Sequence, residues 1–292
     1  MKVAFQGEHG AYSEIAACKF FGNGKLDTLP AKMLKDVFKK VKSKEADNGI
    51  VPVENSTAGD VHETYDLLLE NGLKVTGEAY LRIEHCLIGH KDAELKDVKK
   101  VYSHTQALAQ CDEFLNVLGA EEFAVYDTAG AVMIIKQHGK KEEAAIASEQ
   151  AAKMYGLKVL KKGIQTDNDN TTRFFIITGK KGKEKQKETP VKSGGRKTSI
   201  VFSTKHEAGA LYRCLGGFAA NSINMTKLVS RPLKNRQWEY AFYLDFVGDL
   251  NDEHVKKALN TLQKNSLFAK ILGCYNTGDG ERFSTKQPQH KL

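Results

Sequence analysis

Three segments of this chain gather amide and hydroxyl side chains at points where an apolar run ends or begins. They span residues 53–60, 102–111 and 166–174. Amide and hydroxyl groups donate and accept hydrogen bonds without changing their charge at neutral pH. Such groups suit chemistry in which a substrate is held and polarised by neutral donors.

The first segment, residues 53–60, follows a predicted buried strand and precedes a predicted helix. We expect backbone N–H groups and small side chains to face one point there, which would suit a carboxylate. The candidate substrate-binding residues are Asn55, Ser56 and Thr57. The alternative is ordinary helix capping by Thr57 or Asp60, with Asn55 in a turn.

The second segment repeats this arrangement, with a strand end followed by a helix. Its candidate substrate-binding residues are Ser103, Gln106 and Gln110, and the two glutamines share one helix face because they are four residues apart. Ser103 and His104 do not predict a nucleophile with its base, because adjacent residues on a strand point to opposite sides. No Gly-x-Ser-x-Gly turn surrounds the serine either.

Histidine, glycine and cysteine patterns do not indicate metal or nucleotide chemistry. His85 and His90 flank a predicted strand without a nearby carboxylate cluster, so we interpret both as structural. The Gly7-Glu8-His9-Gly10 turn lacks both phosphate-binding glycine patterns. The five cysteines form no Cys-x-x-Cys pair, which favours reduced, mostly buried thiols. We therefore predict neither a metal nor a cofactor.

The net charge of +8 is confined to two segments. Residues 179–197 contribute +6 and residues 281–292 contribute +2, which leaves the rest of the chain neutral. A basic spacer and tail around a neutral body are typical of solvated segments, so nucleic acid is not the expected partner. The chain has no run of about 18 apolar residues and no signal peptide, which predicts a cytoplasmic protein without membrane association.

Alternating strands and helices before the basic segment predict an α/β fold in two lobes. The first lobe takes residues of about 1–80 and 166–178, and the second takes about 81–165. The strand at 172–178 would return to the first lobe and bring distant segments around one cleft. Residues 179–197 predict a flexible linker, residues 198–275 a ferredoxin-like βαββαβ module, and residues 276–292 a polar tail.

The order of several short motifs resembles the prephenate dehydratase family. These motifs are Asn170-x-Thr172-Arg173-Phe174, Gly7-x-x-Gly10-x-Tyr12-Ser13-Glu14, Val51-Pro52-Val53-Glu54-Asn55-Ser56, Tyr102-Ser103-His104-x-Gln106 and Ala144-Ala145-Ile146-Ala147. Behind the linker, Gly209-Ala210-Leu211 and Ser230-Arg231-Pro232 resemble the ligand motifs of the ACT regulatory domain. The resemblance implies a cofactor-free carbon–oxygen lyase with a periplasmic-binding-protein-like catalytic domain and an ACT domain that senses phenylalanine.

The resemblance also implies roles for individual residues. Catalytic residues would be Thr172, which assists the leaving hydroxyl, together with Arg173 and Phe174 of the signature. Asn55, Ser103 and Gln110 would position prephenate, and a surface or interlobe ion pair is the alternative for Arg173. The regulatory ligand site would comprise Gly209, Ala210, Leu211, Asn224, Ser230 and Arg231.

Three positions depart from the family pattern. Ala11 stands where the family has Thr or Ser, Thr105 where it has Pro, and Val229 where it has Glu. The last departure removes a carboxylate beside the sensing loop. We expect a monofunctional homodimer or homotetramer. Two alternatives to prephenate dehydration stay open: arogenate dehydration, and non-enzymatic sensing of an amino acid.

Overall fold

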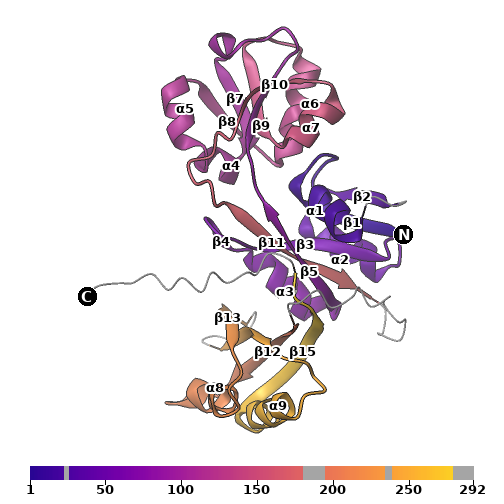
Figure 1. Cartoon of the computed structure of the whole chain (residues 1–292), viewed down its shortest axis with the longest axis vertical. Helices are drawn as coiled ribbons and strands as arrows, with labels where there is room; N and C mark the ends of the chain where they lie inside the picture. Colours follow the sequence, from indigo (N-terminus) through magenta and orange to yellow (C-terminus); the bar gives the residue numbers. More distant parts are fainter. Residues whose placement is uncertain (23–25, 180–194, 234–238, 279–292) are drawn as a thin grey trace, which may run out of the picture. The chain divides into compact units, whose positions relative to one another are not determined.

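The computed structural model describes residues 1–22, 26–179, 195–233 and 239–278 (Figure 1). The chain divides into two compact units. The first comprises Met1–Lys74 and Leu81–Lys180, and the second comprises Val75–Tyr80 and Lys181–Leu292. Most of the predicted linker, and the predicted tail after residue 278, lie outside the described residues.

The first sheet of the first unit has the strand order β2-β1-β3-β11-β5, with β4 beside β3. Its strands are β1 (Lys2–Gln6), β2 (Asp27–Ala31), β3 (Asn48–Asn55), β4 (Gly59–Asp60), β5 (Lys74–Arg82) and β11 (Thr171–Thr178). Helices α1 (Tyr12–Phe21), α2 (Leu34–Lys42) and α3 (His62–Asn71) accompany them. The pairs β1–β2 and β1–β3 are parallel, whereas β11 runs antiparallel to β3, as expected for a returning strand.

The second sheet has the order β10-β6-β9-β7-β8. Its strands are β6 (Cys86–Gly89), β7 (Lys100–His104), β8 (Glu121–Val125), β9 (Glu143–Ala147) and β10 (Lys158–Lys162). Its helices are the short 3-10 turn Leu95–Asp97, α4 (Thr105–Ala109), α5 (Asp112–Leu118), α6 (Thr128–His138) and α7 (Glu149–Tyr155). The predicted two-lobed α/β architecture is therefore confirmed, and β2 and β10 are strands that the sequence pattern did not reveal.

Helix α2 illustrates how spacing positions these elements. Leu34, Val37, Phe38 and Val41 recur at helical spacing and all four are buried. Burying each such side chain contributes about 1.5–3 kcal/mol. The helix predicted to carry Gln106 and Gln110 is followed by a second helix, because the chain turns at Gln110 and Cys111. At this turn the Gln110 carbonyl accepts from Thr166 N–H.

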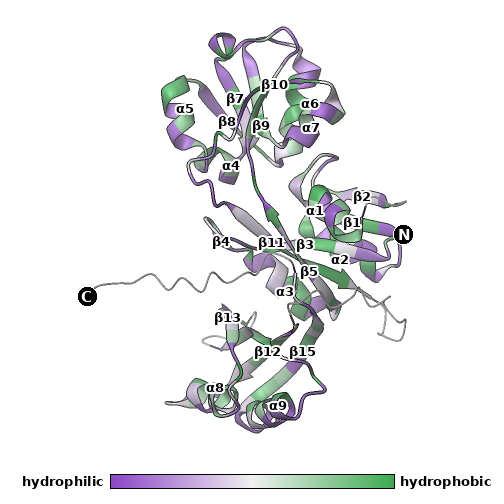
Figure 2. Ribbon diagram, viewed as in Figure 1, coloured by the Kyte–Doolittle hydropathy of each residue, from purple (hydrophilic) through white to green (hydrophobic). Residues whose placement is uncertain are grey.

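The second unit contains the predicted βαββαβ module. Its strands are β12 (Arg196–Thr204), β13 (Met225–Pro232), β14 (Tyr240–Val247) and β15 (Ser266–Asn276), in the order β13-β14-β12-β15. Helices α8 (Ala210–Ala220) and α9 (Glu253–Asn265) carry both hydrophilic and hydrophobic residues (Figure 2). Their apolar residues form one core with the strands, including Phe202, Phe218 and Phe246.

The second unit also takes a segment that the sequence placed in the first lobe. Val75–Tyr80, inside β5, groups with this unit, and Glu78 pairs with Lys197 at 3.4 Å. Both side chains are fully buried. Lys197 belongs to β12 rather than to the linker, because a buried carboxylate offsets the cost of burying its charge. Gly273 leaves no room for a Cβ, which would lie 1.9 Å from the Val75 carbonyl oxygen.

The described residues include no helix long and apolar enough to cross a membrane. The same residues contain no group of three or more His, Cys, Asp or Glu side chains that could hold a metal ion. All five cysteines are free thiols, and Cys86, Cys111 and Cys214 are buried.

Candidate active site

The pairing of β3 with β11 creates the centre of the candidate active site. Asn55, the last residue of β3, lies opposite Thr172 in the antiparallel register. Its amide Nδ2 donates to Thr172 Oγ1 at 3.0 Å and to Asn170 Oδ1 at 2.7 Å. Asn55 is 6% exposed and Asn170 only 1%. Asn55, which is more than a hundred positions away in sequence, thus bonds directly to the catalytic candidate Thr172.

The oxygen of Asn55 occupies the point at which we expected a substrate carboxylate. Oδ1 accepts from Thr57 N at 3.1 Å, Ala58 N at 2.9 Å and Thr57 Oγ1 at 2.7 Å. Helix α3 begins only at His62, after β4, so this turn does not open the helix directly. The expectation of a helix N-terminus at this point is wrong, and so is the alternative of capping by Thr57 or Asp60, because Val61 precedes α3. Asn55 is the last residue of β3, and its side-chain oxygen accepts from the turn that follows.

Gln110 brings the second sheet to this cluster. Its Nε2 donates to Asn55 Oδ1 at 3.2 Å and to Thr57 Oγ1 at 2.8 Å. Its Oε1 accepts from Asn170 Nδ2 at 3.0 Å. Gln110 ends α4, and its position there depends on the turn between α4 and α5. The cluster is therefore a closed set of neutral amides and hydroxyls that joins both sheets.

Two further residues extend the cluster, and sequence analysis assigned neither to the site. His85 is 2% exposed, and its Nε2 lies 2.9 Å from Gln110 Oε1. Its Nδ1 lies 2.9 Å from the hydroxyl of Tyr12, which begins α1. Burial lowers the pKa of His85, although the bond to Gln110 opposes this shift. Burial also raises the pKa of Tyr12 well above its usual value. Tyr12 belongs to the glycine motif at the start of the chain, and this was its only signal.

The other predicted substrate-binding residues lie around this cluster. Ser56 Oγ donates to the Asp169 carbonyl at 3.1 Å and accepts from Thr171 N at 2.9 Å, so it ties β3 to the loop before β11. Ser103 is fully buried, and its hydroxyl donates to the Ile146 carbonyl at 2.7 Å. Gln106 is exposed at the start of α4. Contact of these three residues with substrate stays a prediction.

Arg173 and Phe174 follow Thr172 on β11 but are more deeply buried. Arg173 is 5% exposed, lies 3.9 Å from the Glu54 carboxylate and stacks over Phe175 at 4.9 Å. Phe174 is 2% exposed and belongs to the core. Arg173 thus pairs with Glu54 of the neighbouring strand β3, within the first lobe rather than between the lobes. Its positive charge is balanced beside the neutral cluster.

The glycine motif joins the first sheet to the helices of the second. Ser148 Oγ donates to the Gly10 carbonyl at 2.7 Å, and Glu8 N donates to the Asp127 carboxylate at 3.0 Å. Gly10 has φ +91°, and a Cβ there would lie 2.7 Å from the Ala151 Cα. This close approach explains the requirement for glycine, and it places α1 and Tyr12 against the second lobe.

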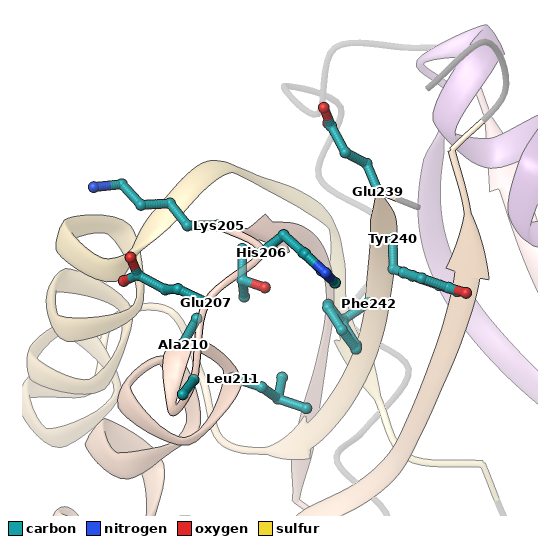
Figure 3. Close-up of a pocket in the computed structure, with 10 residues that line it drawn as sticks. Lys205, His206, Glu207, Ala210, Leu211, Glu239, Tyr240 and Phe242 are labelled. Atoms are coloured by element: carbon teal, nitrogen blue, oxygen red, sulfur yellow. The ribbon is translucent and has the colours of Figure 1, made fainter. Parts of the chain in front are cut away.

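The second unit contains a separate hollow of about 360 Å³ at the start of α8 (Figure 3). Gly209 precedes the helix with φ +74°, and the predicted residues Ala210 and Leu211 line the hollow. The remaining lining residues are Thr204, Lys205, His206, Glu207, Ala208, Glu239, Tyr240 and Phe242. Sequence analysis missed Glu239, which precedes β14, and Tyr240, which begins it, because neither belongs to a motif.

The predicted regulatory residues do not all meet in one hollow of one chain. Asn224 lines a different hollow, together with Arg196 and His254. Ser230 and Arg231 lie on β13 and do not line the hollow at α8. Val229 is 8% exposed and lies opposite Tyr243 of β14. A carboxylate at this position would be largely withdrawn from water.

Comparison with known proteins places these observations in a family. The sequence profile described as prephenate dehydratase matches residues 3–182. The chain is 39% identical over 286 residues to an Arabidopsis thaliana protein named arogenate dehydratase/prephenate dehydratase 2, chloroplastic. That match covers 94% of this chain and 72% of the plant protein.

Two solved structures are similar over nearly the whole chain. Prephenate dehydratase from Arthrobacter aurescens in complex with L-Phe has a TM-score of 0.84 and 28% identity, covering 94% of this chain and 89% of that one. A protein described as GqqA, a novel type of quorum-quenching acylase, also has a TM-score of 0.84, with 33% identity. It covers 95% of this chain and 98% of its own.

Proposed function

Because this chain belongs to the prephenate dehydratase family, a family of lyases, we propose that it converts prephenate to phenylpyruvate, carbon dioxide and water. The ring C–O bond breaks, the ring carboxylate leaves as carbon dioxide, and its electron pair completes the aromatic ring. The departing hydroxyl takes one proton and leaves as water. The protein must therefore supply a hydrogen-bond donor to that hydroxyl.

One observation carries this proposal: Thr172 Oγ1 accepts a hydrogen bond from Asn55 Nδ2 at 3.0 Å. Since the amide is the donor in that bond, the threonine's own hydrogen is directed elsewhere. One lone pair of Thr172 Oγ1 thus accepts from Asn55, and the hydroxyl hydrogen is available for the leaving group. Polarisation by a positioned donor of this kind contributes roughly 10²–10⁴-fold to a rate.

The neutrality of the cluster supports decarboxylation. Asn55, Gln110 and Asn170 are amides, and burial keeps His85 uncharged at neutral pH by lowering its pKa. The charge of Arg173 is balanced by Glu54. A cation beside the ring carboxylate would stabilise it and slow its loss, so neutral donors favour the transition state over the bound substrate.

Asn55 has a different role from the one expected of it. Its two amide hydrogens are used on Asn170 and Thr172, and its oxygen accepts from two backbone N–H groups, so we assign Asn55 to positioning Thr172 rather than to holding substrate. Gln110 takes the same kind of role through Asn55 and Thr57.

The choice between prephenate and arogenate belongs to the same proposal. The two substrates differ only in a keto or amino group on the side chain, and the plant relative is named for both activities. The neutral cluster offers no carboxylate dedicated to an amino group, which favours the keto acid. Turnover of both substrates under the same conditions would test this preference.

We further propose that phenylalanine regulates the enzyme from the hollow at α8. The Arthrobacter aurescens structure is described as a complex with L-Phe. Leu211 and Phe242 offer an apolar surface, and Glu239 brings a carboxylate for the amino group in the absence of a glutamate at position 229. Since Asn224, Ser230 and Arg231 lie outside this hollow, we expect a second copy of the chain to supply them in a homodimer or homotetramer.

Assays on the purified full chain also distinguish dehydration from two other activities. Acyl hydrolysis, suggested by the name of one structural relative, would need an accessible nucleophile, whereas the Ser103 hydroxyl is buried and donates to Ile146. Phenylpyruvate production from prephenate by the purified full chain supports the dehydratase. Hydrolysis of an N-acyl amide without dehydration would favour the acylase, and phenylalanine binding without any turnover would favour a sensor.

A further inference from the structure

We infer that Tyr12 and His85 are positioning residues that complete a one-way chain of hydrogen bonds ending at Thr172. This inference rests on the proposed dehydratase function. It concerns the buried His85 and the half-buried Tyr12, which come from different lobes. Neither is among the hydrogen-bond partners given above for Thr172. Tyr12 begins α1 of the first lobe, and His85 lies between β5 and β6.

The direction begins with Asn55, whose amide orientation is fixed by the backbone. Its oxygen accepts from the N–H groups of Thr57 and Ala58, which can only donate. The Gln110 atom that faces this oxygen at 3.2 Å must therefore be the amide nitrogen. The oxygen of Gln110 consequently faces His85 and Asn170.

The orientation of Gln110 in turn determines the tautomer of His85. An acceptor, Gln110 Oε1, lies 2.9 Å from Nε2, so this ring nitrogen must carry a hydrogen. In a neutral imidazole the other nitrogen, Nδ1, then has only a lone pair. Tyr12 lies 2.9 Å from Nδ1 and supplies the hydrogen bond donor that Nδ1 needs.

Tyr12 has a second acceptor within reach, the Glu84 carbonyl at 2.9 Å. Donation to that carbonyl would require His85 Nδ1 to carry the hydrogen and would leave a bare Nε2 facing Gln110 Oε1. Two acceptors would then oppose each other, and the Gln110 amide would have to turn over and present its oxygen to Asn55 Oδ1. The fixed orientation of Asn55 thus selects donation from Tyr12 to His85.

All the bonds then point one way: from Tyr12 to His85, to Gln110, to Asn55 and finally to Thr172. Hydrogen bonds that point one way polarise each other, particularly when they are shielded from water. The backbone of His85 is also held by two hydrogen bonds. Its backbone N–H donates to Gln165 Oε1 at 2.9 Å, and its backbone carbonyl accepts from the Ile164 N–H. These bonds fix the backbone from which the ring extends.

Substitutions at His85 separate this role from simple packing. In His85→Gln, the side-chain amide can still donate to Gln110, whereas His85→Leu keeps bulk but loses the donor. We expect His85→Leu to lower kcat by roughly 10–100-fold, as for a misplaced catalytic group. We expect His85→Gln to retain at least several times the kcat of His85→Leu, with KM changed less than kcat in both variants.

A milder change tests the other end of the chain of bonds. Tyr12→Phe removes only the hydroxyl, and we expect kcat to fall by up to about tenfold, the effect of one net hydrogen bond. Tyr102→Phe is the matched control, because Tyr102 stacks on Phe123 in the second lobe and takes no part in these bonds. Equal kcat for Tyr12→Phe and the control would overturn the role of Tyr12.

Nitrogen NMR of histidine-labelled full-length protein tests the inference without turnover. The His85 signal is identified by its loss in His85→Gln, and we expect a neutral ring protonated at Nε2 in the wild type. A ring protonated at Nδ1 would overturn the inference, as would wild-type kcat in His85→Leu. If the wild type makes no phenylpyruvate, the proposed function fails, whereas the observed tautomer still decides the direction of the bonds. If His85→Leu does not fold, the tautomer and Tyr12→Phe decide.

Discussion

The candidate active site and the candidate regulatory site are built in opposite ways. In the active site, Asn55, Gln110 and His85 are bonded to one another and carry no net charge at neutral pH. The hollow at α8 is lined by Lys205, Glu207 and Glu239 beside apolar surface. The first arrangement fixes donors before substrate arrives, and the second offers charges and space to a ligand that brings its own charges.

This difference follows from what each site must stabilise. Dehydration needs groups that are better bonded to the transition state than to the substrate, and fixed dipoles achieve this without rearranging. An amino acid needs partners for an ammonium group and a carboxylate, which charged side chains and a helix N-terminus provide. Substitutions that disturb fixed hydrogen bonds should therefore lower kcat most around Thr172. Substitutions that remove a charge should weaken ligand binding most around Glu239.

The largest effect is expected at Thr172. Thr172→Ala removes the only hydroxyl that we assign to the leaving group, and kcat should fall by at least roughly 100-fold with a much smaller change in KM. Thr172→Ser is the matched control and should retain far more activity. Steady-state kinetics with prephenate would measure both variants, and more than half of the wild-type activity in Thr172→Ala would contradict the assignment.

A similar but smaller loss is expected when the donor to Thr172 becomes an acceptor. In Asn55→Asp the carboxylate would accept the threonine's hydrogen, which is then no longer available for the leaving hydroxyl. We expect kcat to fall by roughly 10–100-fold. The same kinetics measure it, and a loss seen only in KM would return Asn55 to the role of a substrate contact.

At the regulatory hollow the effect should appear in binding. Glu239→Gln removes the carboxylate that we assign to the amino group of phenylalanine, and affinity should fall by roughly tenfold or more. Glu253→Gln is the control, since Glu253 pairs with Lys256 on α9 outside the hollow. Calorimetry with phenylalanine on the intact protein would measure both. Equal affinities would remove Glu239 from the site, and no binding at millimolar ligand would remove the site itself.

The smallest effect concerns pH and stability. The pKa of His85 is lowered in the folded protein by burial, so the unfolded chain binds a proton more readily as pH falls below about 6.5. Stability contributed by the neutral ring is therefore present at pH 7.5 and is lost progressively as pH falls from 6.5 towards the folded pKa. Urea unfolding should show a larger loss between pH 7.5 and 5.5 in the wild type than in His85→Gln. Equal losses would mean that His85 is not held neutral by burial.

Local patterns in the sequence predicted the architecture well. Helix α2 and the βαββαβ order follow from spacing, and the returning strand β11 follows from its β-rich composition. Lys197 illustrates the limit, because a lysine in a basic run reads as linker until its buried partner Glu78 is known. Pairing across more than a hundred residues leaves no mark on local composition.

The same limit applies to the candidate site. Motif resemblance identified Thr172, Asn55 and Gln110, but it gave no sign that the Asn55 amide donates to both Asn170 and Thr172. His85 lies next to an apolar strand and looked structural, and its role appears only when Tyr12 and Gln110 come together from both lobes. The motifs therefore identified Thr172, Asn55 and Gln110 as candidate site residues. Three-dimensional contacts are needed to determine which side chains donate hydrogen bonds and which accept them.

Turnover of prephenate by the purified full-length wild type, measured beside Thr172→Ala, tests the central claim most directly. The proposed function predicts phenylpyruvate from the wild type without an added metal or cofactor, and a rate at least roughly 100-fold lower from the variant. Equal rates for the two proteins would contradict the role of Thr172. No phenylpyruvate from the wild type would contradict the function itself.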